Sequence, residues 1–262
     1  MREVALARAG VGGALALWLT SLCHAATVLI TGANSGIGLE FSKQYAAAGW
    51  TVIATHHRPT TPDTLLELAG KYPNVRAEAM DVTDVAQVQR LSAKLKDVPI
   101  DVLINNAGVY DDHGDWSTQE FGKLDYKLCD TILAVNVKGP LLVSEAFRSQ
   151  VRAGKQKKIV SISSSHGTIT QPIAGSGAIF YRASKAALNR EMRVVADTLK
   201  PDGITVVLMH PGAVRTERMT GVSYPGQVET SYSVAHMINT IDALTTRDTG
   251  RFLLYDGTTV PW

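Results

Sequence analysis

Two alternating patterns of hydrophobic and polar positions run through residues 27–262. Short apolar runs rich in β-branched residues are typical of strands, and longer stretches with apolar residues three or four positions apart are typical of helices. Strands are predicted at 27–31, 51–55, 75–79, 100–104, 158–163, 204–209 and 251–255. Helices are predicted at 37–49, 84–96, 121–135, 138–153, 178–200 and 234–244.

This alternation indicates an α/β fold in which parallel strands are joined by helical crossovers. We expect a doubly wound, seven-stranded parallel sheet with helices on both faces. The chain has 262 residues, of which 45% are hydrophobic, enough for one substantial core. No repeat, low-complexity tract or linker marks a second domain, so residues 27–262 are predicted to form one domain.

The first 26 residues have a different character. Arg2 and Arg8 accompany an uncharged apolar stretch at 10–22, and small residues follow at 23–26. This layout predicts a cleaved export signal, and therefore a periplasmic or secreted protein. The apolar stretch is shorter than the ~20 residues of a membrane span, so no stable span is expected. An N-terminal extension on a cytoplasmic protein is the alternative.

Charge and cysteine content exclude several classes of protein. Lys and Arg number 26 against 24 Asp and Glu, so there is no polybasic surface and no nucleic-acid partner is expected. Cys23 and Cys129 are the two cysteines, which rules out a disulfide framework or a cysteine-rich metal site.

A glycine-rich segment, TGANSGIG, joins the first predicted strand to the first predicted helix. Glycines at such a turn let the backbone approach a pyrophosphate, whose charge the N-terminus of the helix stabilises. The spacing departs from G-x-G-x-x-G, but the strand–turn–helix context is the one that a dinucleotide site needs. A turn without a ligand is the alternative. The candidate cofactor-binding residues here are Gly32, Asn34, Ser35, Gly36, Ile37 and Gly38.

The end of the second predicted strand bears on the choice of dinucleotide. NAD sites carry an acidic residue here, yet this chain reads His56, His57 and Arg58, with no acid before Asp63. A guanidinium can bind a 2′-phosphate through paired hydrogen bonds, so Arg58 favours NADP, with NAD still possible. A solvated basic turn would also explain these residues.

Further cofactor contacts are expected where the third and fourth strands end at the same edge of the sheet. The candidates are Asp81, Val82, Asn106, Ala107 and Gly108. Asp81 could instead serve only the turn before the next helix.

Tyr181 and Lys185 are four positions apart on a predicted helix and share one face. A nearby ammonium group would lower the pKa of the phenol, which could then exchange a proton near neutral pH. Taken alone, the pair could equally be an ordinary surface contact.

Taken together, the motifs TGANSGIG, NNAG, VNVKGP, IVSISSSHG, YRASK and HPGAVRT resemble short-chain dehydrogenases/reductases over nearly the whole chain after Ala26. The segments VNVKGPLLVSEA and GRFLLYDGTTVPW resemble the C-factor and sniffer-type carbonyl reductases. The resemblance implies a Rossmann fold and hydride transfer between NADP and a small carbonyl or alcohol substrate. It also implies a homodimer or homotetramer, with contacts through the helices at 138–153 and 178–200.

The resemblance also assigns roles to residues. It implies that Asn136 anchors a proton-relay water, that Ser164 hydrogen-bonds the substrate carbonyl and that Tyr181 is the general acid/base. Lys185 would lower the pKa of Tyr181 and hold the nicotinamide ribose. The segment beside the nicotinamide would contain Pro211, Gly212, Val214 and Thr216.

The sequence leaves some alternatives open. The segment between Ser164 and Tyr181 is longer than is usual in this family, and Ser163 or Ser165 could replace Ser164. His166 is a candidate for touching the substrate, whose pocket is expected at 109–120, 166–180 and 213–232. The acids and histidine of 110–116 are interpreted as a polar loop, because no metal is needed for this chemistry and no helical ligand pair is present.

Two other functions compete with the oxidoreductase. One is a signalling or interaction protein that binds the cofactor within the same fold, although such a role would not require all four candidate catalytic residues. The other is a sugar-nucleotide epimerase, which would be expected to have a longer substrate-binding region after the core.

Overall fold

The computed structural model describes residues 25–110, 116–170, 177–217 and 226–262. Its centre is a seven-stranded sheet in the order β3-β2-β1-β4-β5-β6-β9, and all neighbouring strands are parallel. The strands are β1 (Thr27–Ile30), β2 (Thr51–His56), β3 (Val75–Ala79), β4 (Val102–Asn105), β5 (Lys158–Ile162), β6 (Thr205–His210) and β9 (Phe252–Leu254). The predicted doubly wound α/β fold is confirmed, whereas most of the predicted export signal lies outside the described residues.

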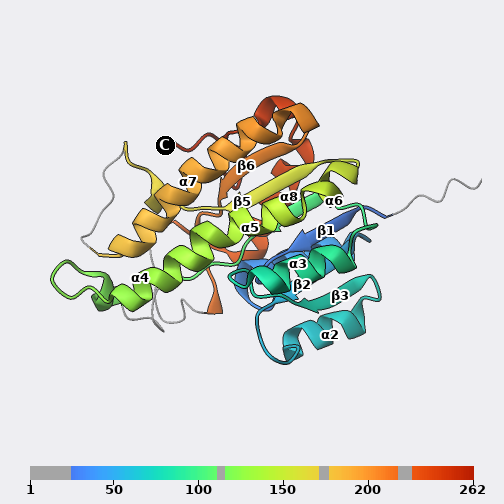
Figure 1. The fold of residues 1–262 in the computed structure, drawn as a ribbon, viewed down its shortest axis with the longest axis horizontal. Helices are drawn as coiled ribbons and strands as arrows, with labels where there is room; N and C mark the ends of the chain where they lie inside the picture. The colour runs from blue at the N-terminus through green and yellow to red at the C-terminus, as the bar shows by residue number, and fades with distance from the viewer. Residues whose placement is uncertain (1–24, 111–115, 171–176, 218–225) are drawn as a thin grey trace, which may run out of the picture.

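Helices pack on both faces of this sheet (Figure 1). One face is covered by α1 (Gly36–Ala47), α2 (Asp63–Lys71) and α8 (Thr230–Ala243). The other is covered by α3 (Val85–Lys94), α5 (Gly139–Ala146), α6 (Arg148–Ala153) and α7 (Ile179–Leu199), with α4 (Tyr126–Leu133) beyond them.

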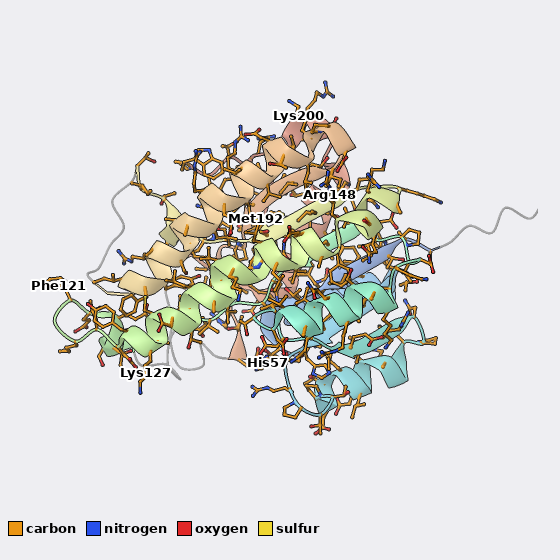
Figure 2. The ribbon with its side chains drawn as sticks, in the orientation of Figure 1. His57, Phe121, Lys127, Arg148, Met192 and Lys200 are labelled. Atoms are coloured by element: carbon orange, nitrogen blue, oxygen red, sulfur yellow. The ribbon has the colours of Figure 1, made fainter. Side chains whose placement is uncertain are left out.

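Alternation along the strands divides the core into two layers. In β1, Val28 and Ile30 join the core beneath α1, whereas Leu29 joins the core beneath α7. Met192 of α7 is fully buried in that second core, while Lys200 lies beyond the end of the helix (Figure 2). The sheet is therefore held from both sides, which leaves its carboxyl edge to form a site.

Several elements differ from the sequence prediction. Helix α2 was not predicted; it has nine residues and buries just Leu65 and Leu68. The helix predicted at 138–153 is divided at Phe147, whose φ of −98° and ψ of 7° interrupt it. Also not predicted was a second, two-stranded parallel sheet formed by β7 (Ala213–Arg215) and β8 (Gln227–Glu229).

Among the described residues, no helix is both long enough and apolar enough to cross a membrane.

Candidate active site

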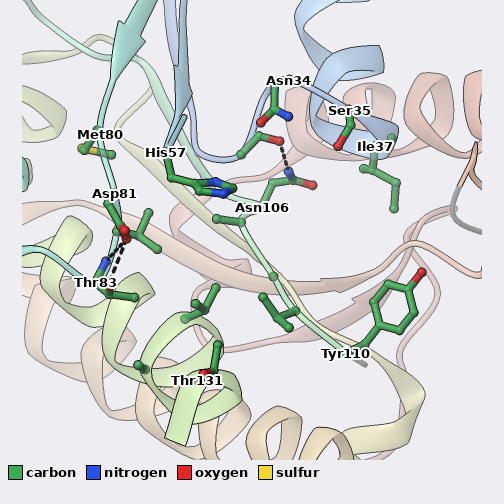
Figure 3. A pocket seen from close by; sticks show the side chains of 18 of the residues that line it. Asn34, Ser35, Ile37, His57, Met80, Asp81, Thr83, Asn106, Tyr110 and Thr131 are labelled. Atoms are coloured by element: carbon green, nitrogen blue, oxygen red, sulfur yellow. Dashed lines mark hydrogen bonds between the residues drawn. The ribbon is translucent and has the colours of Figure 1, made fainter. Parts of the chain in front are cut away.

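Strands β1 and β4 are neighbours in the sheet, and the chain leaves their carboxyl ends toward opposite faces, to α1 on one side and to α4 and α5 on the other. A crevice forms at such a switch point in an open α/β sheet. A cavity of about 520 Å³ lies there. In Figure 3, Asn34, Ser35 and Ile37 border it after β1, and Asp81 and Tyr110 lie on opposite sides. The predicted cofactor residues that line it are Gly32, Asn34, Ser35, Gly36, Ile37, Asp81, Val82, Asn106, Ala107, Gly108 and Thr216.

The glycine-rich segment is shaped by close packing against the end of β4. Gly32 has a φ of +63°, and a Cβ atom there would lie 2.9 Å from the Cα of Ala107. A Cβ atom on Gly38 would lie 2.3 Å from the carbonyl oxygen of Gly32. Side chains at these positions would push the loop away from the sheet. We call the loop at 32–38, together with the end of β4 that packs against it, the cradle. Gly38 supports this cradle and is not among the residues that line the cavity.

Asn106 holds the same loop through hydrogen bonds. Its amide donates to the carbonyl oxygens of Thr31 at 2.9 Å and Gly32 at 3.1 Å. The Thr31 hydroxyl in turn accepts from the backbone N–H groups of Asn106 and Ala107. The residues predicted to touch a cofactor thus also fix the shape of its cradle.

The part of the cavity beside the ends of β2 and β3 is bordered by His57 and Asp81 (Figure 3). Asp81 accepts two hydrogen bonds from Thr83, which is the turn role that the sequence allowed, and it also borders the cavity. Its contact with a cofactor stays a prediction. Arg58 is exposed and is not among the described lining residues, whereas His57 is. The basic side chain nearest the cavity at the end of β2 is therefore His57.

Asn136 lies in a single π-helical turn, 134–138, between α4 and α5, and its side chain is 1% exposed. Its Oδ1 accepts from the backbone N–H of Val109 at 2.8 Å, and its Nδ2 donates to the carbonyl of Val109 at 2.7 Å. Nδ2 also donates to the hydroxyl of Ser184 at 3.0 Å. Asn136 thereby connects the segment after β4 to the helix that carries Tyr181.

The three consecutive serines have different surroundings. Ser163 donates to Oδ1 of Asn189 at 2.5 Å. Ser164 is 7% exposed, accepts from the backbone N–H of His166 and hydrogen-bonds the Tyr181 phenol. The carbonyl of Ser165 accepts from Thr168. Of the three, Ser164 is the one described with a hydrogen bond to Tyr181, and its contact with a substrate carbonyl stays a prediction.

Tyr181 and Lys185 lie together on α7, as the spacing predicted. The Nζ of Lys185 is 5.7 Å from the centroid of the Tyr181 ring and donates to the carbonyl of Ile162 at 3.0 Å. Burial lowers the pKa of Lys185 to about 8. A Cβ atom on Gly108 would lie 3.9 Å from this Nζ, so the pair stands where the cavity ends.

The pKa of Tyr181 differs in direction from the sequence expectation. Burial, supported by the neighbouring Tyr110, raises the pKa of Tyr181 to about 12, and the hydrogen bond with Ser164 opposes this rise. Lys185 is not among the causes of this shift in the pKa of Tyr181, whose largest cause is the desolvation of the buried phenolate.

Three residues near Tyr181 were not assigned a catalytic or cofactor role from the sequence. The rings of Tyr110 and His166 contact the Tyr181 ring edge to face, at 6.2 Å and 5.9 Å between centroids. Gln119 is fully buried, accepts from the backbone N–H of Tyr181 at 2.9 Å and donates to the carbonyl of Tyr110. No local pattern marks such contacts, since the partners of Gln119 are distant in sequence.

The segment predicted to lie beside the nicotinamide forms the turn into β7. Gly212 has a φ of +84°, and Val214 pairs with Val228 of β8. The carbonyl of Pro211 accepts from Ser233 at 2.6 Å. These three residues shape the turn, and Thr216 is the predicted member that lines the cavity.

The described residues contain no group of three or more His, Cys, Asp or Glu side chains that could hold a metal ion. Most of the acidic loop at 110–116 lies outside them.

Comparison with known proteins identifies the family of the chain. The family model for short chain dehydrogenases matches residues 26–225. C-signal of Myxococcus xanthus is 39% identical over 164 residues, which cover 63% of this chain and 93% of that protein. An NADPH-bound carbonyl reductase from chicken fatty liver has 31% identity and a TM-score of 0.83, over 91% of this chain and all of that one. Carbonyl reductase Sniffer of D. melanogaster has 27% identity and a TM-score of 0.80 over the same shares. The chain therefore belongs to the short chain dehydrogenase family, and it is an NAD(P)-dependent oxidoreductase.

Proposed function

We propose that this protein is an NADP-dependent carbonyl reductase that transfers hydride to a neutral aldehyde or ketone. The observation that carries the proposal is the hydrogen bond between Ser164 and the Tyr181 phenol, with Lys185 beside it at the end of the cavity. A hydroxyl pair of this kind can bind and protonate a carbonyl oxygen as charge develops on it.

The cradle fits a dinucleotide. The first turn of α1 faces the cavity, and packing requires glycine at positions 32 and 38, which keeps the loop backbone close to any ligand there. When bound, NADPH would supply the hydride. The NADP form is favoured because His57 borders the cavity where NAD-binding sites carry an acid, and Arg58 follows it. The similar carbonyl reductase from chicken carries NADPH.

Tyr181 would provide the proton. Because its pKa is raised to about 12, the phenol is protonated at neutral pH, which is the form that can donate. Ser164 would donate a hydrogen bond to the same substrate oxygen. Lys185, whose pKa is about 8, is mostly charged at neutral pH and would favour the phenolate that remains after proton transfer.

The surroundings of Tyr181 support a neutral, partly apolar substrate. The rings of Tyr110 and His166 lie against its ring, and burial together with Arg182 lowers the pKa of His166, so His166 is neutral at neutral pH. Neutral rings beside the proton donor suit an aldehyde or ketone.

The test is the consumption of NADPH by the purified protein with a panel of aldehydes, ketones and quinones, repeated with NADH. We expect turnover of at least one carbonyl compound, with a higher kcat/KM for NADPH than for NADH. Equal or higher values for NADH would contradict the NADP assignment.

The likeness to C-signal favours a second candidate, a signalling protein that binds the cofactor without turnover. Tight binding of NADPH with no reduction of any panel member would support it.

A further inference from the structure

The N-terminus of α1 already has an anionic partner within the chain. The backbone N–H of Gly36, the first residue of α1, donates to Oε1 of Glu217 at 2.8 Å. The two residues are 181 positions apart in the sequence. Both line the cavity, so this carboxylate lies inside the site and is presented to it from the segment after β7.

The helix itself leaves this position open for an anion. Ser35, the N-cap residue, makes no capping hydrogen bond with its side chain among the described residues, and the first turn contains no acidic residue. Gly36 has a φ of +52°, and a Cβ atom built on it would lie 4.0 Å from Oε1 of Glu217. The carboxylate thus takes the role that an N-cap side chain usually has.

A dinucleotide needs the same place. The pyrophosphate of a cofactor in this type of fold is stabilised by the free N–H groups and the positive dipole end of the first helix. A carboxylate bonded to Gly36 both occupies one of these donors and repels a second anion.

We propose that Glu217 competes with the cofactor pyrophosphate for the N-terminus of α1 and thereby weakens cofactor binding. Glu217 must leave Gly36 when the dinucleotide binds, and it can return when the dinucleotide leaves. The side chain is exposed, so this exchange requires no repacking of the core. The proposal rests on the proposed function only in that a dinucleotide binds in this cavity.

The test is a direct binding titration of NADPH, followed by calorimetry, for the wild type and for Glu217→Gln. The amide keeps the size of the side chain and removes its charge. We expect NADPH to bind about two- to tenfold more tightly to the variant, because an anion at a helix N-terminus contributes on this scale. Glu217→Ala should shift the dissociation constant in the same direction.

Glu229→Gln is the matched control. Glu229 is an exposed carboxylate of β8 that pairs with Arg215 at 3.0 Å, so the substitution removes one negative charge close by without touching Gly36. We expect an unchanged dissociation constant for this variant. An equal gain in both Gln variants would show a general charge effect and overturn the proposal.

The outcomes separate this proposal from the proposed function. If the wild type binds NADPH and Glu217→Gln binds it equally or more weakly, Glu217 is a helix cap and not a competitor, and the function is unaffected. If the wild type binds neither NADPH nor NADH, both the proposal and the proposed function fail.

Discussion

Replacing Gly38 with alanine tests how the cofactor cradle is built. The added Cβ atom would lie 2.3 Å from the carbonyl oxygen of Gly32 and 2.4 Å from Nδ2 of Asn106. Ordinary van der Waals contact begins near 3.4 Å, so the loop or the helix must move by about 1 Å. Overpacking of this kind costs about 1–3 kcal/mol of the free energy of unfolding.

The same displacement would disturb the hydrogen bonds from Asn106 to Thr31 and Gly32, which fix the loop. We therefore expect Gly38→Ala to weaken NADPH binding at least about tenfold, which corresponds to about 1.4 kcal/mol. Binding would be measured by calorimetric titration, and the free energy of unfolding by urea denaturation.

Gly70→Ala provides the control. Gly70 lies in α2, and a Cβ atom there would meet nothing within 4 Å. Alanine at a helical position is favoured over glycine by about 0.5–1 kcal/mol, so this variant should be as stable as the wild type or more so, with unchanged NADPH binding. If Gly38→Ala bound NADPH like the wild type at an unchanged free energy of unfolding, the account of the cradle would be wrong.

Three further outcomes follow from the site. Ser164→Ala should lower carbonyl reduction by about 10²-fold or more in the NADPH assay, while Ser163→Ala should keep most of it; equal losses would contradict the assignment of Ser164. Gln119→Ala removes the side chain that accepts from the backbone N–H of Tyr181. It should reduce the free energy of unfolding, measured by urea denaturation, by about 1–3 kcal/mol. An unchanged free energy of unfolding would mean that this hydrogen bond does not contribute to stability. Alcohol oxidation requires the phenolate, so its rate should keep rising with pH above neutrality because the pKa of Tyr181 is raised to about 12; a plateau at or below pH of about 7 would show that the phenol ionises far more easily.

Much of the fold could be predicted from the sequence because most of its strands are short runs rich in apolar and β-branched residues. Every predicted strand is present, with ends shifted by a few residues at most. The pairing of Tyr181 with Lys185 was predictable for the same kind of reason, since a four-residue spacing places two side chains on one helical face. The positions of the strands and the pairing of Tyr181 with Lys185 both follow from local periodicity in the sequence.

Other features depend on contacts between distant segments. Strand alternation indicated that only some of the serines could face the cleft, but the partner of Ser163 on α7 is a tertiary contact. Glu217 meets Gly36 only because β7 brings it to the first helix. The raised pKa of Tyr181 depends on burial at the assembled site, which no spacing in the sequence measures.

The most direct test of the central claim compares the wild type with Tyr181→Phe in two measurements, the dissociation constant for NADPH and the rate of NADPH consumption with a carbonyl substrate. Removing the hydroxyl leaves the ring and the cradle in place, so NADPH should bind as tightly as it does to the wild type. The rate of reduction should fall by about 10²–10⁴-fold, the range that a positioned proton donor contributes. A variant that reduces the carbonyl compound as fast as the wild type would contradict the assignment of Tyr181 as the proton donor.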